Sequence, residues 1–547
     1  MLDSRLLALT ADVRALLARG LEALSRSDGD TATLKQALQD LDGPFLLVVA
    51  GEFNSGKSSL LNALLGDEFL KEGVTPTTDR VNLIGYGPEA KLEPISPELV
   101  LISLPHPMLK DLRMVDTPGT NAIVQHHQVL TQQFLPRADL ILFVTSADRP
   151  FTQSEAEFLK FIKAWGKKIV LVINKMDLLT PPELQQVLDF VRSGADKTLG
   201  SVPHIFAISS RRAKQGDKAA SNLGQLETHI QTVLGSQAAA IKLGSPLGVL
   251  ARVIEEHQPT LQTRLKGVES QLATCRELDA LALRHEERTR RDFAGQIALV
   301  SQSLDAVRER GEKWLEEKVR ISNVLNLLNS AKLKQSFLDE VVAGANADIE
   351  KGVLQAMSWL AKRDKELLED ALHLLKEAPG LRYPSSPQEE SIEDNVQQAL
   401  ATFRPEEEAQ FLRDHIQEGL QQTAIFEVGA VGIGAGLLLI FNRIFLDVLG
   451  IFTGLIVAVI GLTILPRRKE QAKARLRERI ADLRGRIEAA LAQNLELELT
   501  RTRERFQSLY RTSYLRLEGQ AQTLQGQIDE QDQLRDAALE MGRKLGS

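Results

Sequence analysis

The sequence is poor in several residue types, and each shortage excludes a class of protein. Its 547 residues include one cysteine, Cys275, so no intramolecular disulfide can form and a reducing compartment is the simpler expectation. Aromatic residues make up only 5% of the chain, whereas Ala, Leu, Glu, Gln and Arg dominate long stretches, which favours long helices. The net charge of −7 lacks the basic excess that nucleic-acid-binding chains usually carry. We therefore expect no nucleic-acid partner.

The N-terminus lacks the uninterrupted apolar segment of a secretory signal, because Asp3 and Asp12 interrupt it. Apolar residues instead recur at helical spacing, at Leu2, Leu6, Leu9, Val13 and Leu17. We expect an amphipathic helix here and a chain that begins in the cytosol or an equivalent compartment. The length exceeds what a single core supports, so two or more domains are expected.

Five short apolar runs between residues 45 and 210 predict an α/β sheet. They lie at 45–50, 112–115, 140–145, 168–174 and 204–209. Helix-sized segments separate them, as is typical of buried parallel strands. Beyond Pro246 the strand signals stop and the pattern is helical almost throughout. The expected fold is an α/β domain with a mostly parallel sheet, followed by a long all-α helical bundle.

The stretch GEFNSGKSS, residues 51–59, directly follows the first predicted strand and precedes a predicted helix. It matches G-x-x-x-x-G-K-S, a loop whose backbone N–H groups and helix N-terminus bind phosphates. Lys57 is expected to neutralise the β- and γ-phosphates, and the Ser58 hydroxyl to ligate Mg²⁺. The residues expected to contact the nucleotide here are Asn54, Ser55, Gly56, Lys57, Ser58 and Ser59.

Two further segments predict the metal and γ-phosphate contacts. DTPG follows the strand at 112–115, so Asp116 can hold the metal through water and the Gly119 N–H can sense the γ-phosphate. The loop at 73–80 offers Thr77 and Thr78, one of which would complete the metal shell; we favour Thr78, and Thr77 stays open.

The stretch NKMD, residues 174–177, predicts recognition of guanine. Asp177 can accept hydrogen bonds from the N1–H and the exocyclic amine, two donors that adenine lacks. Asn174 is expected to brace the loop and the stem of Lys175 to lie over the base. Ser209 and Ser210 follow the last predicted strand, where a backbone N–H would meet the guanine O6.

Together GEFNSGKSSLLNALLG, the TPTT loop, DTPGT and NKMD resemble the GTPase domain of bacterial dynamin-like proteins, the branch closest to mitofusins. The resemblance implies a P-loop GTPase that hydrolyses GTP to GDP with Mg²⁺, slowly, and faster when two GTPase domains meet in a homodimer or oligomer. It also implies a hydrophobic helical hairpin between long bundle helices. The catalytic set would be Lys57, Ser58, Thr78, Asp116 and Gly119. Phe53 and Asn54 stand where conventional dynamins have Gln and Ser, and no arginine finger can be assigned.

Two apolar segments, 428–441 and 448–465, flank Asn442, Arg443 and Asp447. As helices they would measure roughly 21 and 27 Å, against a hydrocarbon core of ~30 Å. The pair can be core helices, a transmembrane hairpin, or a re-entrant tip in one leaflet. We favour a membrane hairpin with the polar residues at its turn, because the basic run at 466–479 would then meet anionic headgroups. The expected lipid contacts are Leu438, Phe441, Phe445, Leu449, Phe452 and Ile456.

These signals predict five parts. They are an N-terminal helix packing with the neck (1–40), the GTPase domain (41–245), the helical neck and trunk (246–424), the hydrophobic paddle (425–468) and the returning trunk helices (469–547). The function expected is a GTPase that remodels membranes from their cytoplasmic face, by fusion, fission or tubulation. The alternative is a soluble switch GTPase of the ribosome-assembly or RNA-modification kind.

Overall fold

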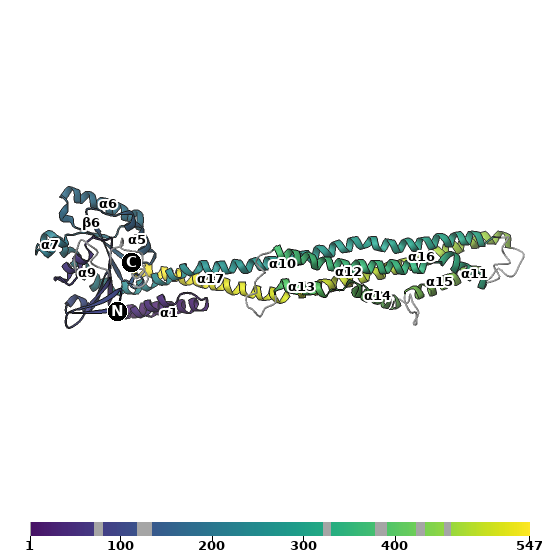
Figure 1. Cartoon of the computed structure of the whole chain (residues 1–547), viewed down its shortest axis with the longest axis horizontal. Helices are drawn as coiled ribbons and strands as arrows, with labels where there is room; N and C mark the ends of the chain where they lie inside the picture. The colour runs from purple at the N-terminus through teal and green to yellow at the C-terminus, as the bar shows by residue number, and fades with distance from the viewer. Residues whose placement is uncertain are drawn as a thin grey trace. The chain divides into compact units, whose positions relative to one another are not determined.

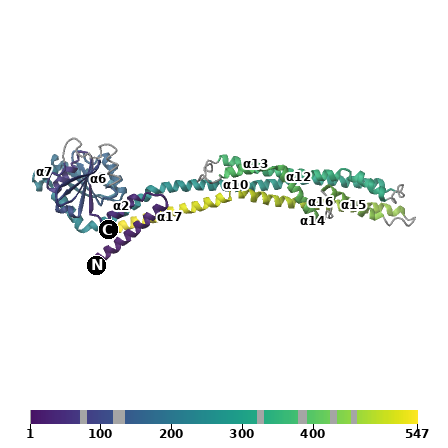
Figure 2. The same ribbon diagram turned by 60° about the horizontal axis from the view of Figure 1, so that its bottom comes forward.

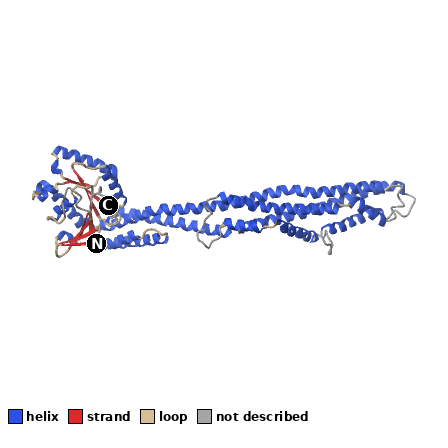
Figure 3. Cartoon of the chain, in the orientation of Figure 1, coloured by secondary structure: helices blue, strands red, loops and turns tan. Residues whose placement is uncertain are grey.

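The structure is a computed structural model, and it describes residues 2–70, 80–117, 134–320, 330–377, 391–422, 433–452 and 461–546. The chain forms two compact units. The first unit contains residues 1–265 together with 522–547, and the second contains residues 266–521. Every described strand belongs to the first unit, and the described elements of the second unit are helices (Figure 3).

An eight-stranded sheet forms the centre of the first unit. Its strands are β1 (Phe45–Ala50), β2 (Val81–Tyr86), β3 (Lys91–Ser96), β4 (Leu99–Leu104), β5 (Leu112–Asp116), β6 (Leu140–Ser146), β7 (Lys168–Asn174) and β8 (His204–Ala207). Their order in space is β3-β4-β2-β5-β1-β6-β7-β8. The apolar runs predict β1 and β5 to β8 correctly and miss β2, β3 and β4.

The centre of the sheet is parallel. In β1, Val48 lies opposite Val115 of β5 on one side and Ile141 of β6 on the other. The antiparallel pairs are β2 with β5 and β3 with β4, so the prediction of a mostly parallel sheet is confirmed. Because β1, β5, β6 and β7 run in the same direction, their carboxyl ends meet at one edge of the sheet.

Alternate residues of β1 enter two different cores. Leu46 and Val48 pack into a core that includes residues of α5 (Gln153–Ala164) and α6 (Pro181–Leu199). Leu47 and Val49 pack on the other face, in a core that includes α3 (Lys57–Leu65) and α9 (Leu223–Thr232). A strand covered on both faces must be apolar throughout, which is why β1 reads as an unbroken run.

Both ends of the chain pack in the first unit. The helices involved are α1 (Leu2–Arg26), α2 (Ala32–Asp40), the start of α10 (Ala238–Lys318) and the end of α17 (Arg511–Gly546). Figure 1 marks both chain ends near the sheet. Leu24, Ile254 and Leu534 share one core. At its edge, Ser27 Oγ lies 3.1 Å from His257 Nε2 and accepts a hydrogen bond of 2.9 Å from Gln531 Nε2. This bundle therefore joins residues from near the two ends of the sequence, such as Ser27 and Gln531.

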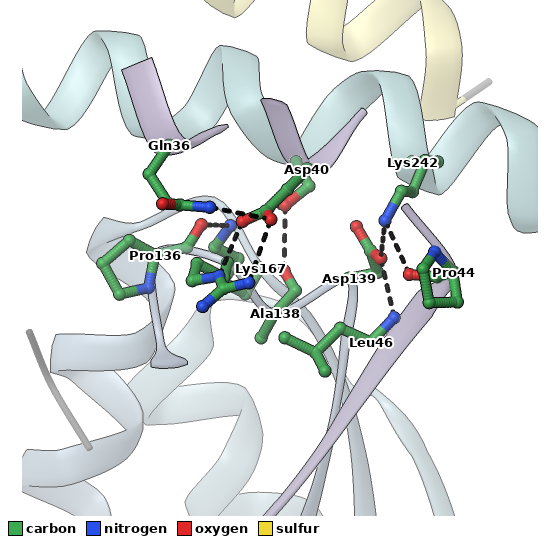
Figure 4. A network of polar contacts seen from close by, with 11 residues as sticks. Gln36, Asp40, Pro44, Leu46, Pro136, Ala138, Asp139, Lys167 and Lys242 are labelled. Atoms are coloured by element: carbon green, nitrogen blue, oxygen red, sulfur yellow. Dashed lines mark hydrogen bonds and ion pairs between the residues drawn. The ribbon is translucent and has the colours of Figure 1, made fainter. Parts of the chain in front are cut away.

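A buried lysine connects the sheet to α10 (Figure 4). Lys167 Nζ donates to the carbonyl oxygen of Pro136 and to Ser245 Oγ, both at 2.6 Å, and Ser245 Oγ in turn donates to the carbonyl oxygen of Ala138 at 2.8 Å. The side chain is only 7% exposed. Burial lowers the pKa of Lys167 to about 7, since desolvation disfavours the ammonium form.

A second buried group, Asp139, ties α10 to β1 beside this lysine (Figure 4). Its Oδ2 accepts hydrogen bonds of 2.8 Å from Lys242 Nζ and from the backbone N–H of Leu46. Arg137 Nε donates to Asp40 Oδ2 of α2 at 2.7 Å. Residues 136–139 are thus held by contacts from α2, α10 and the sheet at once.

The lowered pKa of Lys167 predicts a pH dependence of stability. An unfolded lysine titrates near 10.5, and the folded one near 7. Between these values the unfolded chain binds more protons, so stability should rise with pH by up to about 1.4 kcal/mol per unit.

Lys167→Met should remove that rise between about pH 7 and about pH 9. Hydrogen exchange of the β6 and β7 amides measures it for the first unit alone. Lys168→Met, which changes a neighbouring lysine bonded to Gln237 at the surface, should keep the wild-type slope; equal slopes in all three proteins would contradict the prediction.

The second unit is a bundle of long helices (Figure 2). Besides parts of α10 and α17 it contains α11 (Ser330–Phe337), α12 (Ala345–Glu377), α13 (Ile392–Thr402), α14 (Pro405–Gln422), α15 (Ile433–Leu449) and α16 (Gly461–Ser508). Six apolar residues of α16 at helical spacing are buried in the main core of this unit: Leu476, Ile480, Leu483, Ile487, Leu491 and Leu495. Cys275 is buried in a second core of the same unit.

The predicted turn at Asn442, Arg443 and Asp447 is wrong, because α15 runs without a break from Ile433 to Leu449. A charged residue is accommodated inside this helix by a partner from α16, where Arg479 Nη2 lies 2.7 Å from Asp447 Oδ2. The polar residues therefore do not mark a hairpin turn.

Two sides of α15 have different surroundings. Phe441 and Phe445 are 0% and 2% exposed and belong to the main core, so their predicted role as lipid contacts is wrong for this conformation. Leu438, which is also among the predicted lipid contacts, is 40% exposed, and Leu439 and Leu446, which are not, are 45% and 61% exposed. Leu449 packs partly against the core, and the side chain of Phe452 and all of Ile456 lie outside the described residues. An exposed leucine face thus remains on a helix whose other face is packed.

The basic run at 466–479 is engaged in ion pairs. Lys469 and Lys473 pair with Glu316, and Arg477 Nε lies 2.8 Å from Glu312 Oε1. Exposed ion pairs of this kind are worth about 1 kcal/mol or less, so they can be exchanged for other anions. The contact of this run with lipid headgroups stays a prediction.

Among the described residues, one helical stretch, Leu223–Lys318, has the length and apolar composition needed to cross a membrane. Its apolar residues Leu247, Leu250 and Ile254 are buried in the core around the sheet. Core packing therefore accounts for these three apolar residues.

Candidate functional site

The phosphate-binding loop lies between β1 and α3 and takes a conformation that glycine makes possible. Gly51 and Gly56 have φ of 150° and 88°, and Asn54 has φ of 61°. A Cβ at Gly51 would lie 2.1 Å from the carbonyl oxygen of Val144, and a Cβ at Gly56 would lie 2.2 Å from Asn174 Nδ2. Both glycines are thus required by close approach as well as by φ.

Lys57 begins α3 and is buried in the loop. Its Nζ donates to the carbonyl oxygens of Gly51 at 3.1 Å and Glu52 at 2.9 Å. Burial lowers the pKa of Lys57 to about 8, against the attraction of Asp116, Glu155 and Glu52. An ammonium held by neutral carbonyls gains much more from phosphate oxygens, so the loop is ready to exchange these contacts for an anion.

Ser58 and Asp116 lie together beneath the loop. Ser58 Oγ donates to Asp116 Oδ2 at 2.7 Å, and Thr117 Oγ1 fixes the start of DTPG by donating to the carbonyl oxygen of Val49 at 2.9 Å. Asp116 is fully buried, and burial raises its pKa. Its Oδ1 has no hydrogen-bond partner among the described residues. A hydroxyl and an unsatisfied carboxylate oxygen are the hard donors that Mg²⁺ prefers, so these residues fit that ion.

Asn174 connects the phosphate loop to the predicted base-recognition segments. Its Nδ2 donates to the carbonyl oxygens of Ser55 at 3.1 Å and Gly56 at 3.3 Å. Its Oδ1 accepts from the backbone N–H of Lys175 at 2.8 Å and from the N–H and Oγ of Ser210, both at 3.1 Å. One side chain thus positions three loops, a larger role than the bracing that the sequence predicts.

Asp177 is oriented by a serine that the sequence assigns to another contact. Ser209 Oγ donates to Asp177 Oδ1 at 2.5 Å and accepts from the backbone N–H of Arg212 at 3.1 Å, capping α7 (Ser210–Lys214). Lys175 has φ of 63°, a left-handed conformation, and its Nζ lies 3.7 Å from Asp148. Ser209 therefore fixes Asp177 rather than standing only beside the base.

The separate motifs meet in one pocket of about 360 Å³. Its lining includes the predicted residues Asn54, Gly56, Ser59, Asn174, Lys175, Asp177 and Ser210. Leu178, Arg211 and Lys214 line it as well, and the sequence reasoning missed them. Their positions, one residue after NKMD and within the helix that starts at Ser210, would have indicated them. Ser55 and Ser209 lie behind the lining residues, bonded to them.

Two glutamates near Lys57 occupy no fixed position of a motif, and the sequence reasoning missed them as well. Glu52 Oε1 accepts from Thr152 Oγ1 at 2.6 Å and Ser154 Oγ at 2.7 Å, which links the loop to the start of α5. Glu155 is buried, which raises its pKa to about 7, and it accepts from Thr145 Oγ1 at 2.9 Å. Both belong to the support of the loop.

Thr78 and Gly119, predicted to contact the metal and the γ-phosphate, lie outside the described residues, as does Thr77. Of the predicted catalytic residues, Lys57, Ser58 and Asp116 are described and lie together.

Comparison with known proteins gives the site a family context. A family model described as "50S ribosome-binding GTPase" matches residues 46–175. The "Probable transmembrane GTPase FZO-like, chloroplastic" of Arabidopsis thaliana is 34% identical over 279 residues, 45% of this chain and 31% of that protein. "Dynamin-like protein 2" of Campylobacter jejuni is 28% identical over 207 residues, one third of each chain. The chain therefore spans only part of the length of the curated relatives it matches.

A solved structure extends the likeness beyond this domain. It is described as "An oligomerised bacterial dynamin pair provides a mechanism for the long range sensing and tethering of membranes". The likeness covers 93% of this chain and 91% of that one, with a TM-score of 0.53 and 16% sequence identity. At this identity the likeness concerns the fold, an α/β domain with long helices. Residues 46–175 thus form a GTPase domain; part of the chain is similar in sequence to FZO-like and dynamin-like GTPases, and its fold is similar to that of a bacterial dynamin.

Proposed function

We propose that this chain binds GTP with Mg²⁺, hydrolyses it to GDP and phosphate, and acts on a lipid membrane through its helical unit. The observation that supports the nucleotide half most strongly is the pocket of about 360 Å³ in which the phosphate loop meets Asn174, Asp177 and Ser210. The curated relatives are matched over less than two thirds of their length, so the activity of the whole chain rests on this geometry.

In this proposal each described residue has one task. Lys57 exchanges its carbonyl contacts for the β- and γ-phosphates, and Ser58 with Asp116 would hold Mg²⁺, which neutralises charge on the phosphate oxygens. Asp177, oriented by Ser209, accepts the two guanine donors, and the Ser210 N–H lies at the same pocket. Thr78 and Gly119 keep the roles that the motifs predict for them. Hydrolysis then needs a water in line with the bond between the β- and γ-phosphates.

The membrane half of the proposal relies on the exposed face of α15. Leu438, Leu439 and Leu446 lie on one side of this helix at 40%, 45% and 61% exposure, whereas soluble helices usually present polar residues there. The solved dynamin pair is described as tethering membranes. We propose that these leucines contact lipid and that Phe441 and Phe445 anchor the helix in the core. The chain would then lie on the cytoplasmic face of a membrane.

Charged substitutions on the exposed leucine face should abolish lipid binding. Leu438→Asp with Leu446→Asp leaves the core side of α15 intact but places two carboxylates where apolar contact is expected. Leu299→Asp with Leu497→Asp is the matched control, since these leucines are 49% and 60% exposed on α10 and α16. In co-sedimentation with anionic liposomes, the control should pellet like wild type and the α15 variant should stay in the supernatant. Wild type that stays in the supernatant with GTP and without it, or an α15 variant that pellets fully, would reject the lipid contact.

Self-association through the GTPase domains is the third part of the proposal. If two domains complete each other's site, GTP turnover per molecule should rise with protein concentration until dimers form, and then level off. Phosphate release measured across a dilution series tests this. Constant turnover per molecule over the series, with a monomer at every concentration by light scattering, would rule it out.

The alternative of a soluble ribosome-assembly GTPase has one observation in its favour, the description of the matching family model. That match ends at residue 175, and the net charge of −7 is opposite to the basic balance typical of RNA-binding chains.

A further inference from the structure

The edge of the sheet at β3 exposes two large apolar side chains. Leu92 is 63% exposed and Ile95 is 58% exposed. β3 is the outermost strand on its side of the sheet, and among the described strands it pairs with β4 alone. The N–H and C=O groups on its outer side have no strand partner in the described part of the chain. Such an edge is a template for pairing with another strand.

Leu92 belongs to an apolar face of the sheet. It lies opposite Ile102 of β4, and Ile102 is buried in the core that includes α3 and α9. Directly opposite residues of an antiparallel pair point to the same face. Leu92 therefore continues this apolar layer to the edge of the sheet, where its side chain is largely exposed.

Pro94 and a bulge limit how much of this edge can pair. Ile95 has no opposite residue on β4, because the register shifts between Pro94 and Ser96. Proline in a sheet places its nitrogen on the side that has no ladder hydrogen bonds. Leu92, two residues earlier, then directs its own N–H and C=O to the same free side. The segment that can pair is thus short, residues 90–94, and Leu92 is its centre.

The charges of this segment complement a second copy of it. The side chains of Lys91 and Glu93 are 67% and 43% exposed and form an ion pair with each other, on the face opposite to Leu92. When two copies pair antiparallel with Leu92 opposite Leu92, Lys91 of each copy lies opposite Glu93 of the other. Registers centred on residue 91 or 93 place like charges opposite each other, which is destabilising. Charge and apolar contact therefore select the same register.

We propose that the β3 strands of two copies of this chain pair antiparallel about Leu92, so that the two sheets join across a two-fold axis. In this register the two Leu92 residues exchange two backbone hydrogen bonds. The N–H of residue 90 in each copy donates to the carbonyl oxygen of Pro94 in the other. Because proline has no N–H to donate, the ladder ends there, and the contact stays limited to this short register.

This contact does not involve the nucleotide pocket. None of the described residues that line that pocket belongs to β2, β3 or β4, and β4, β2 and β5 separate β3 from β1 in the sheet. The pairing should therefore form without nucleotide, unlike the association of two nucleotide sites proposed above. Its small area is typical of weak, transient contacts, so a dissociation constant of about 10⁻⁵ to 10⁻⁴ M is expected.

Disulfide cross-linking of the nucleotide-free full chain tests the register. Leu92→Cys places two thiols opposite each other at the centre of the pairing, at a Cα separation that suits a disulfide. Ile95→Cys is the matched control on the same strand, because its exposure is similar but its two copies would lie about 20 Å apart. Cys275 is buried and should not react. Under mild oxidation Leu92→Cys should form covalent dimers at least about tenfold faster than Ile95→Cys.

Charge variants test the complementarity in the same assay. Glu93→Lys, added to Leu92→Cys, places lysines opposite lysines and should slow dimer formation at least about fivefold. Adding Lys91→Glu as well restores unlike charges with their signs exchanged, so this triple variant should recover the rate of Leu92→Cys alone. Circular dichroism checks that each variant folds.

Sedimentation equilibrium without nucleotide gives a second measurement that needs no new thiol. Wild type should associate reversibly at about 10⁻⁴ M, and Glu93→Lys should associate at least about fivefold more weakly. This comparison keeps the test decisive if Leu92→Cys misfolds.

The proposal is overturned if Leu92→Cys cross-links no faster than Ile95→Cys, if Glu93→Lys leaves the rate unchanged, or if the exchanged charges fail to restore it. Wild type that stays monomeric at about 10⁻⁴ M, or that associates no more strongly than Glu93→Lys, overturns it as well. These measurements contain neither nucleotide nor lipid, so their outcome is independent of GTP binding and of the lipid contact.

Discussion

Asp177→Asn should weaken GDP and GTP binding by roughly 10²- to 10⁴-fold and should make xanthosine nucleotides the preferred ligands. The carboxylate accepts from the N1–H and the exocyclic amine of guanine. An asparagine places an NH₂ group opposite that amine, so two donors face each other and a buried hydrogen bond is lost. Xanthine carries a carbonyl oxygen at this position, which the new NH₂ group can reach. Calorimetric titration with GDP and xanthosine diphosphate measures both effects.

The fold should tolerate this substitution. Ser209 Oγ donates to Asp177 Oδ1 at 2.5 Å, and the amide oxygen of asparagine can accept the same bond. Asp148→Asn is the matched control, because Asp148 pairs with Lys175 at 3.7 Å without being among the residues that line the pocket in the described part of the chain. It should retain guanine preference. A folded Asp177→Asn protein that still prefers GDP would show that another group reads the base.

The nucleotide site was predictable because its information is local. The motif at 51–59 fixes a strand, a turn and a helix within one short stretch, and the sheet brings the later motifs to the same edge. The hydrogen bonds of Asn174 to Ser55 and Gly56 follow from that edge alone. Leu178, Arg211 and Lys214 hold no fixed motif position, and only their places beside NKMD and on the helix that starts at Ser210 could have indicated them.

One of the three missed strands, β3, lacks the sequence signal of a strand. In β3 (Lys91–Ser96) most residues are exposed, and Pro94 interrupts the strand at the edge of the sheet. Such a strand shows neither a continuous apolar run nor strict alternation. Strands buried on both faces, such as β1 and β6, have the signal that β3 lacks.

The course of α15 could not be derived from composition. An apolar side chain is stable both in a protein core and in lipid, so the sequence alone does not show which of the two surrounds Phe441 and Phe445. What decides is Arg479, a residue of another helix that neutralises Asp447 inside α15. The two residues are 32 positions apart, so their pairing depends on the tertiary structure and cannot be derived from the local sequence. For that reason the charged residue within an apolar run was predicted to mark a turn.

Lys57→Met should reduce GTP affinity at least about a hundredfold and abolish hydrolysis, while leaving the stability of the nucleotide-free chain nearly unchanged. Burial lowers the pKa of Lys57 from 10.5 to about 8, so holding the ammonium in the folded loop costs roughly 3 kcal/mol at neutral pH. Methionine removes that cost and keeps most of the side-chain volume. Against this, the carbonyl oxygens of Gly51 and Glu52 lose a donor, at about 1–3 kcal/mol each if they stay dry.

Without nucleotide, removing the buried ammonium stabilises the fold and leaving two carbonyl oxygens without a donor destabilises it, so the two effects on stability oppose each other. With GTP bound, the variant also lacks the contact with the phosphates. Without nucleotide the variant should melt close to wild type, and GTP with Mg²⁺ should raise the melting temperature of wild type only. Lys214→Met is the control, because Lys214 lines the pocket beside the phosphate loop and pairs with Glu68 at the surface; it should lose less than about fivefold in affinity. If Lys57→Met bound GTP as tightly as Lys214→Met, the phosphates would have to lie elsewhere. If it melted far below wild type without nucleotide, Lys57 would be holding the loop together, and its loss of binding would report folding rather than phosphate recognition.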